Sequence, residues 1–123
     1  MVIDMRNKVI YVRTCLKGSN LDEQIEMINQ YIKDNNIDIS DYYIDDGYTG
    51  QDKNRPGLNK LLKDISLNKI EIVIVSSYDR LSRDYLMYEN YMDLFKKYNV
   101  ELKAIQWWKI IVSFMLDFQQ KMN

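Results

Sequence analysis

Residues 71–75 read EIVIV, an almost unbroken run of branched apolar side chains between polar neighbours. Such a run is typical of a strand that is covered on both faces, as in a parallel sheet between helices. Residues 8–14, KVIYVRT, have the same character, and residues 42–45 and 100–105 are shorter candidates. The sequence therefore predicts a sheet whose central strands are buried.

Segments with helical spacing of apolar residues alternate with these strands. Ser19 is predicted to cap a helix that ends at the polar cluster 33–36, and Pro56 suits the first position of a helix that runs to Ile65. A third helix is predicted to end near Asn99. This alternation predicts an α/β domain with a central sheet of four to five mostly parallel strands, flanked by helices.

Length and composition fit one folded domain. At 123 residues the chain is long enough to bury a core and too short for two ordinary domains. We assign residues 1–105 to this domain and interpret the apolar tail, residues 106–123, as a C-terminal helix. This helix either packs on a partner subunit, which would make a dimer, or is buried in its own domain. The sequence leaves both possibilities open.

The composition excludes several kinds of chemistry. A net charge of −1 gives no global field that attracts nucleic acid, so such a role would need a local patch. One cysteine and no histidine leave no zinc site of the usual ligands and no histidine general base. No apolar run reaches the roughly 20 residues of a membrane span, and no secretion signal opens the chain. We expect a cytoplasmic protein without metal or cofactor.

Arginines follow two of the predicted strands. Ligands of open α/β sheets bind beyond the carboxyl ends of the strands, where Arg13 ends the first strand and Arg80 and Arg83 follow the third. If these strands are neighbours, three guanidiniums converge, which suits a phosphodiester and an in-line displacement at phosphorus. Cys15 lies two residues after Arg13, on the same side of an extended strand. A nucleophile would stand at this position.

Simpler interpretations of the same residues exist. Arg80 and Arg83 could pair with Asp79 and Asp84 on a solvated helix start, and a single cysteine such as Cys15 is commonly a small core residue. No GxxxxGK[ST] loop is found, so nucleotide hydrolysis has no support. A phosphatase that uses the thiol and an arginine is a further alternative, although its CxxxxxR loop is absent.

Three segments resemble motifs of the N-terminal catalytic domain of the serine recombinases, the resolvase and invertase family, and they occur along the chain in the same order as in that family. Residues 11–15 (YVRTC) resemble the family's YxRxS, and residues 78–84 (YDRLSRD) resemble its LDRLxRD. Between them, residues 45–58 (DDGYTGQDKNRPGL) resemble its acidic, glycine-containing loop that ends in RPGL. The match runs from about Val9 to Ile105. It implies a resolvase-like catalytic core that breaks and rejoins DNA.

The resemblance implies a role for each matching position. Arg13, Arg80 and Arg83 would grip the scissile phosphate, with Arg55 assisting from the loop. Asp79 would either protonate the leaving 3′ oxygen or orient the arginines. Three further positions match the family's site, the last with a threonine in place of a more usual serine: Gln24, Asp46 and Thr49.

The resemblance also implies that Cys15 occupies the position of the family's nucleophile. There a serine hydroxyl attacks phosphorus, leaving a 5′-phosphoserine link and a free 3′ hydroxyl, before subunits rotate in a tetramer and reseal the DNA. Ser19 cannot substitute, because sliding it into register would move Arg13 out. Sulfur is a soft nucleophile poorly matched to phosphorus, so we expect little or no recombination. An inactivated natural copy, a deliberate substitution and a cysteine-dependent variant all remain open.

The end of the chain differs from the family pattern. Members have a long helix after the fourth strand and then a DNA-binding domain, whereas residues 109–122 (KIIVSFMLDFQQKM) only faintly resemble the start of that helix. We therefore expect a truncated catalytic domain that forms a homodimer or tetramer and binds DNA weakly. The alternative is a catalytically inactive module, derived from a serine recombinase, that acts through dimerisation or other protein contacts.

Overall fold

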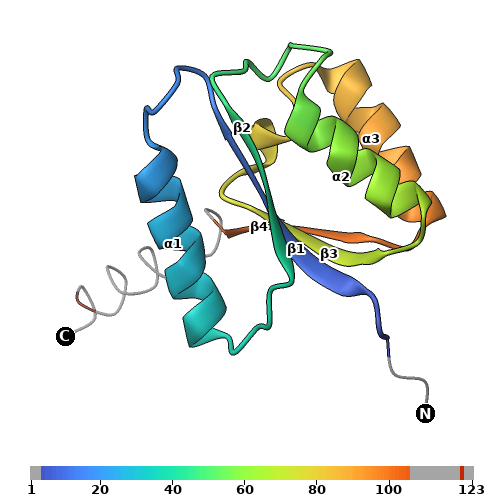
Figure 1. The fold of residues 1–123 in the computed structure, drawn as a ribbon, viewed down its shortest axis with the longest axis horizontal. Coiled ribbons are helices and arrows are strands. Elements are labelled where there is room, and N and C mark those ends of the chain that lie inside the picture. The colour runs from blue at the N-terminus through green and yellow to red at the C-terminus, as the bar shows by residue number, and fades with distance from the viewer. Residues whose placement is uncertain (1–3, 106–119, 121–123) are drawn as a thin grey trace.

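The computed structural model describes residues 4–105 and residue 120. Strands and helices alternate along the chain, and a short 3₁₀ helix, η1, follows the third strand (Figure 1). The elements are β1 (Asn7–Thr14), α1 (Leu21–Asp34), β2 (Asp41–Asp46), α2 (Pro56–Ser66), β3 (Ile70–Val75), η1 (Tyr78–Arg80), α3 (Tyr85–Lys97) and β4 (Glu101–Ala104). Apart from residue 120, the helix predicted for residues 106–123 lies outside the described residues.

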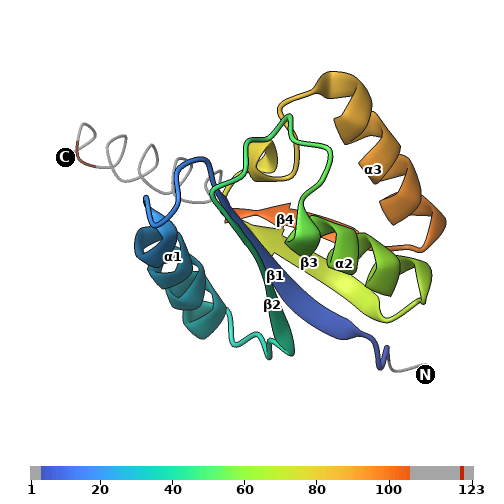
Figure 2. The same ribbon diagram turned by 45° about the horizontal axis from the view of Figure 1, so that its top comes forward.

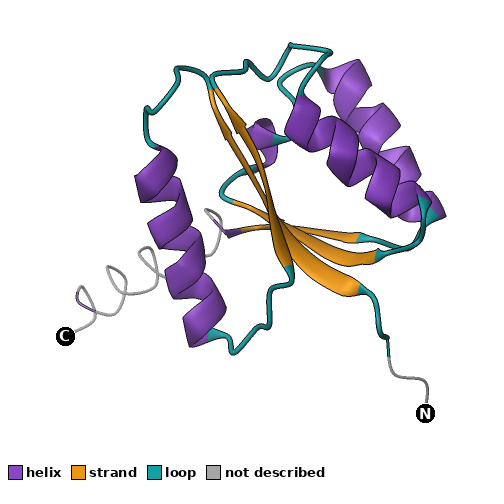
Figure 3. Ribbon diagram, viewed as in Figure 1, coloured by secondary structure: helices purple, strands orange, loops and turns teal. Residues whose placement is uncertain are grey.

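The sheet is parallel throughout, with the strand order β2-β1-β3-β4. Helix α1 covers one face, and α2 and α3 cover the other (Figures 2 and 3). In the central strand β1, Val9 and Tyr11 pack toward α2 and α3, whereas Ile10 and Val12 belong to the core beneath α1. All four side chains are fully buried, which explains the unbroken apolar run. The α/β prediction is confirmed, with four strands in the described part of the chain.

Asparagines end all three described α-helices. Asn36, Asn68 and Asn99 each follow the last helical turn in the left-handed conformation, with φ between 53° and 59°. The residue after each asparagine donates a backbone hydrogen bond to a carbonyl five residues back, which satisfies the free end of the helix. Asparagine tolerates this conformation better than other residues with a side chain. These stops give each crossover a defined turn into the next strand.

The N-terminal ends of the helices confirm one prediction and correct another. Pro56 is the first residue of α2, as predicted. Helix α1 is preceded by Asn20, not by Ser19, and the side chain of Asn20 makes no capping bond. The reason is local, because the amide of Gln24 donates to the carbonyl of Asn20, so the helix begins one residue later than a cap at Ser19 requires. The backbone of Ser19 belongs instead to a turn in which its amide donates to the carbonyl of Leu16.

This topology positions the site. Strands β1 and β3 are neighbours, and the chain leaves β1 toward β2 on one side but continues from β3 toward β4 on the other. The carboxyl ends of these two strands therefore border the crevice in which α/β sheets usually bind ligands. Within the described ranges, no helix is long and apolar enough to cross a membrane.

Asp84 caps helix α3, and its removal is expected to destabilise the fold. Its carboxylate accepts hydrogen bonds from the amides of Leu86 (2.9 Å) and Met87 (3.2 Å). Asp84→Ala should lower the free energy of unfolding by about 1 kcal/mol in urea titrations. Asp93→Ala, an exposed change late in the same helix, removes the same charge but no cap and should not destabilise. Equal losses in both variants would contradict the capping role.

Candidate active site

Arg13 joins three segments of the site at the end of β1. Its side chain is fully buried and donates to the carbonyl oxygens of Arg80 (2.8 Å, from Nε), Asp79 (2.8 Å, from Nη2) and Tyr48 (3.0 Å, from Nη1). The guanidinium of Arg80 donates back to the carbonyl oxygen of Arg13 at 3.1 Å. Hydrogen bonds of Arg13 and Arg80 thus connect η1 to the end of β1, and Arg13 also connects the loop after β2 to this site.

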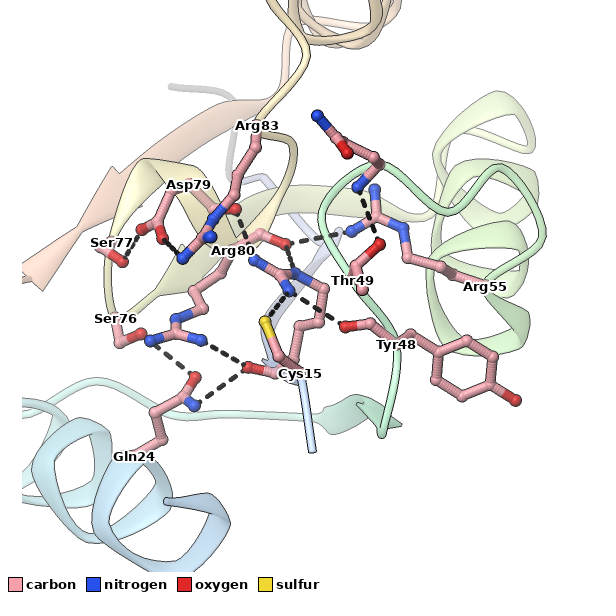
Figure 4. A network of polar contacts seen from close by, with 12 residues as sticks. Cys15, Gln24, Tyr48, Thr49, Arg55, Ser76, Ser77, Asp79, Arg80 and Arg83 are labelled. Atoms are coloured by element: carbon pink, nitrogen blue, oxygen red, sulfur yellow. Dashed lines mark hydrogen bonds and ion pairs between the residues drawn. The ribbon is translucent and has the colours of Figure 1, made fainter. Parts of the chain in front are cut away.

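Cys15 is exposed, one residue beyond the end of β1 (Figure 4). Its Sγ accepts a hydrogen bond from Nη1 of Arg13 at 3.2 Å. The interpretation of Cys15 as a small core residue is therefore wrong. The thiol is open to solvent on the side where the arginines meet, as its spacing from Arg13 predicted.

The segment after β3 supplies Asp79, Arg80 and Arg83. Nη2 of Arg83 lies 3.5 Å from Oδ2 of Asp79, and both side chains are roughly half exposed. The other carboxylate oxygen of Asp79 accepts a hydrogen bond from the Ser77 hydroxyl (Figure 4). Asp84 does not join this pair, because it caps α3 instead. The solvated-pair interpretation thus holds for Arg83 and Asp79 alone.

Asp79 remains ionised beside these arginines. Partial burial acts to raise the pKa of Asp79, but the Ser77 hydroxyl and the charges of Arg80, Arg83 and Arg13 outweigh it and hold the pKa below its ordinary value. An ionised carboxylate accepts hydrogen bonds and attracts guanidinium groups, but it has no proton to give. The geometry thus suits orientation of Arg83 better than protonation of a leaving oxygen.

Arg55 lies behind η1 and is fully buried. Its guanidinium donates to the carbonyl oxygens of Arg80 (3.2 Å) and Leu81. Its Cζ lies 6.0 Å from the centre of the Tyr11 ring, within the range of a cation–π contact. In this arrangement Arg55 supports the turn that carries Asp79 and Arg80, and it offers no exposed surface to a ligand.

Gln24, on helix α1, contacts residues at the ends of β1 and β3. Its side-chain amide donates to the carbonyl oxygen of Arg13 at 3.0 Å and accepts from the Ser76 hydroxyl at 3.2 Å (Figure 4). Beside it, a groove of about 380 Å³ opens between the start of α1 and the end of β3. Its lining residues are Asn20, Glu23, Gln24, Met27, Ser76, Ser77 and Arg80.

Asp46 fixes the segment that follows Cys15. Its carboxylate accepts hydrogen bonds from the Thr14 hydroxyl (2.5 Å) and from the amide of Gly18 (2.8 Å), which together hold its pKa below the ordinary value. Thr49 is exposed, and its hydroxyl accepts a bond from the amide of Gln51 at 3.3 Å. Asp46 therefore organises the loop around the thiol, while Thr49 is bonded within its own loop.

Gly50 lets the loop after β2 lie directly on the arginines. A methyl group in its place would come within 2.8 Å of Cγ of Arg83 and 3.2 Å of Nη2 of Arg13. The carbonyl oxygen of Gly50 also accepts a hydrogen bond from the amide of Arg83 at 3.3 Å. A side chain at this position would push the loop away from the cluster.

The structure adds residues that were not singled out from the sequence. Ser76 and Ser77 follow a buried strand at the carboxyl edge of the sheet, and this position could have indicated from the sequence that they belong to the site. Tyr48 contributes a backbone carbonyl, which every residue has, so no sequence pattern could predict its role.

In the part of the chain that is described, no group of three or more acidic or cysteine side chains could hold a metal ion.

Comparison with known proteins identifies the family of this chain. Residues 8–118 match the family model described as "Resolvase, N terminal domain". A Bacillus subtilis (strain 168) protein named "Putative DNA recombinase" is 37% identical over 98 residues, which are 76% of this chain and 19% of that protein. The chain thus spans about a fifth of the length of this relative.

Solved structures also resemble the fold. The N-terminal catalytic domain of TP901-1 integrase superposes with a TM-score of 0.72 at 26% identity, covering 94% of this chain and 98% of that one. The catalytic domain of ISC1926 TnpA, an IS607-like serine recombinase, gives a TM-score of 0.72 at 23% identity, covering 94% and 84%. The latter likeness concerns the fold alone. With the family model covering most of its length, this chain belongs to the serine recombinase family, through the resolvase-type catalytic domain.

Proposed function

We propose that this site is built to break and rejoin a DNA strand through a covalent 5′-phospho-enzyme link. Cys15 occupies the place of the nucleophile and makes the chain itself slow or inactive in that reaction. One observation carries the proposal, namely an exposed thiol whose sulfur accepts an N–H bond from Arg13 beside Arg80 and Arg83. A phosphodiester placed there would meet both a nucleophile and fixed positive charge.

The proposed step conserves atoms and charge. The thiol of Cys15 loses its proton to solvent, a bond forms from sulfur to phosphorus, and the bond from phosphorus to the 3′ oxygen breaks. The 3′ oxygen takes a proton from solvent and leaves as a hydroxyl. Rejoining is the reverse, in which a 3′ hydroxyl displaces the protein. The ionised Asp79 orients Arg83 toward the phosphate in this scheme.

The alternative is an inactive module that acts through protein contacts. The burial of Arg13 favours it, because this side chain has no exposed surface and already donates to three carbonyl oxygens and to sulfur. Such a module keeps its fold without chemistry and would associate with itself or with an intact recombinase. Size-exclusion chromatography with light scattering tests this role. A strict monomer that ignores an intact recombinase removes its basis.

The nucleophile position can be tested by trapping a covalent adduct. The wild-type chain and Cys15→Ser are incubated with supercoiled and with nicked DNA, and protein attached to a 5′ end is detected on denaturing gels. An adduct with Cys15→Ser alone is expected, because oxygen is the harder nucleophile and the arginines are unchanged. Cys15→Ala serves as the control for attachment at other residues. No adduct with any variant would favour the inactive module.

The exposed arginine can be tested through DNA binding. Arg83→Gln is expected to weaken the binding of a fluorescent duplex about tenfold, the effect of losing one charge-assisted hydrogen bond. It should also lower the salt dependence by about one counterion, as measured by anisotropy at several salt concentrations. Arg6→Gln removes the same charge at a residue that pairs with Asp4, away from the site. Equal weakening in both variants would show that only net charge matters.

A further inference from the structure

A buried chain of polar contacts begins at Asp45, on the side of the sheet opposite α1. This carboxylate is 1% exposed and accepts three hydrogen bonds, from the Tyr11 hydroxyl (2.7 Å) and from the amides of Gly57 (2.6 Å) and Leu58 (2.8 Å). The two amides belong to the first turn of α2, where a negative charge is stabilised. Asp45 is thus a fixed anchor for the phenol.

Tyr11 connects this anchor to Arg55. The phenol is fully buried, and burial raises the pKa of Tyr11 above its ordinary value, so the hydroxyl remains a donor to Asp45. The guanidinium of Arg55 lies over the ring, 6.0 Å from its centre. Nε of Arg55 is buried and has no hydrogen-bond partner among the described residues, so the ring replaces a polar contact for this cation.

Arg55 connects Tyr11 to η1 through hydrogen bonds. It donates to the carbonyl oxygens of Arg80 and Leu81, and Arg13 donates to the same Arg80 oxygen from the other side. Two buried guanidiniums therefore hold one carbonyl at the end of the turn that carries Asp79 and Arg80. Any shift of Arg55 reaches Arg13 through this shared oxygen, and Arg13 in turn donates to the sulfur of Cys15.

We infer that Tyr11 and Asp45 are positioning residues for the arginine cluster. They hold Arg55 against the end of η1 and thereby set the places of Arg80 and of the Arg13 N–H that meets the thiol. The inference rests on the proposed function only in taking η1 as the segment that acts on DNA. Neither residue touches the reacting atoms, and each acts through Arg55.

The chain contains a matched control for this role. Tyr43 is also buried, at 5% exposure, and its hydroxyl donates to the Asp64 carboxylate at 2.5 Å. Its ring lies 5.7 Å from the ammonium nitrogen of Lys60. Phenol, carboxylate and cation recur in this second set, but among the described residues none of the three forms a hydrogen bond with η1. Deleting either hydroxyl removes the same chemistry, and only Tyr11 is connected to the site.

The test compares Tyr11→Phe with Tyr43→Phe in two measurements that need no DNA. The first is the rate of alkylation of Cys15 by iodoacetamide, which reports the thiol because the chain has one cysteine. The second is the set of arginine Nε–H signals in NMR spectra, at most five, among which that of Arg13 reports its bond to the Arg80 carbonyl.

Tyr11→Phe is expected to shift the Nε–H signals of Arg13 and Arg55 and to change the alkylation rate about fivefold, the equilibrium effect of about 1 kcal/mol. Tyr43→Phe should leave both at wild-type values. If both variants lower the melting temperature alike and neither readout moves, Tyr11 is a core residue only and the proposal is overturned. Should Tyr11→Phe not fold, Asp45→Asn is measured instead, and unchanged readouts there also overturn it.

A further experiment with DNA distinguishes a failure of this inference from a failure of the proposed function. In the Cys15→Ser background, Tyr11→Phe is expected to slow adduct formation about fivefold, and Tyr43→Phe to leave the rate unchanged. If Cys15→Ser forms no adduct at all, the proposed function fails, and the NMR and alkylation results alone decide whether Tyr11 positions the cluster.

Discussion

The burial of the Arg13 guanidinium is the constraint on which the site depends. A buried cation is costly unless hydrogen bonds replace its water, and here carbonyl oxygens of residues 48, 79 and 80 do so. Throughout the described residues, no carboxylate lies within ion-pair distance of this group. Three segments far apart in the sequence must therefore keep their places, because moving any one would leave a buried N–H unpaired.

Carbonyl partners also give the site its charge. A carboxylate partner would neutralise Arg13, whereas carbonyl dipoles stabilise the cation without adding an opposite formal charge. Arg55 is held in the same way, and Asp79 faces Arg83 at 3.5 Å. Four of the five arginines thus lie at the carboxyl edge of the sheet, together with the carboxylates of Asp46 and Asp79, on a chain whose net charge is −1. The local pattern, and not the net charge, determines whether a phosphate is attracted.

The sequence predicts the parts of this arrangement that follow from periodicity and topology. The buried strands, the neighbouring ends of β1 and β3, and the meeting of Arg13 with Arg80 follow from apolar runs and from the rule for open α/β sheets. The burial of Arg55 could not be predicted, because its partners are backbone carbonyls about 25 residues further on, and every residue has a carbonyl. The prediction of Ser19 as the cap of α1 was wrong for a similar reason, since a backbone bond from Gln24 to the carbonyl of Asn20 sets the start of the helix.

The same physics explains why the nucleophile and the fold are separable. Nη1 of Arg13 lies 3.0 Å from the Tyr48 carbonyl oxygen and 3.2 Å from sulfur, and the bond to oxygen is the stronger of the two. The scaffold therefore depends on carbonyl contacts and hardly on the atom that would attack phosphorus. Exchanging oxygen for sulfur at residue 15 changes the chemistry while the contacts that hold η1 and the loop persist. The contacts that maintain this fold are therefore separate from the atom on which the proposed bond to phosphorus depends.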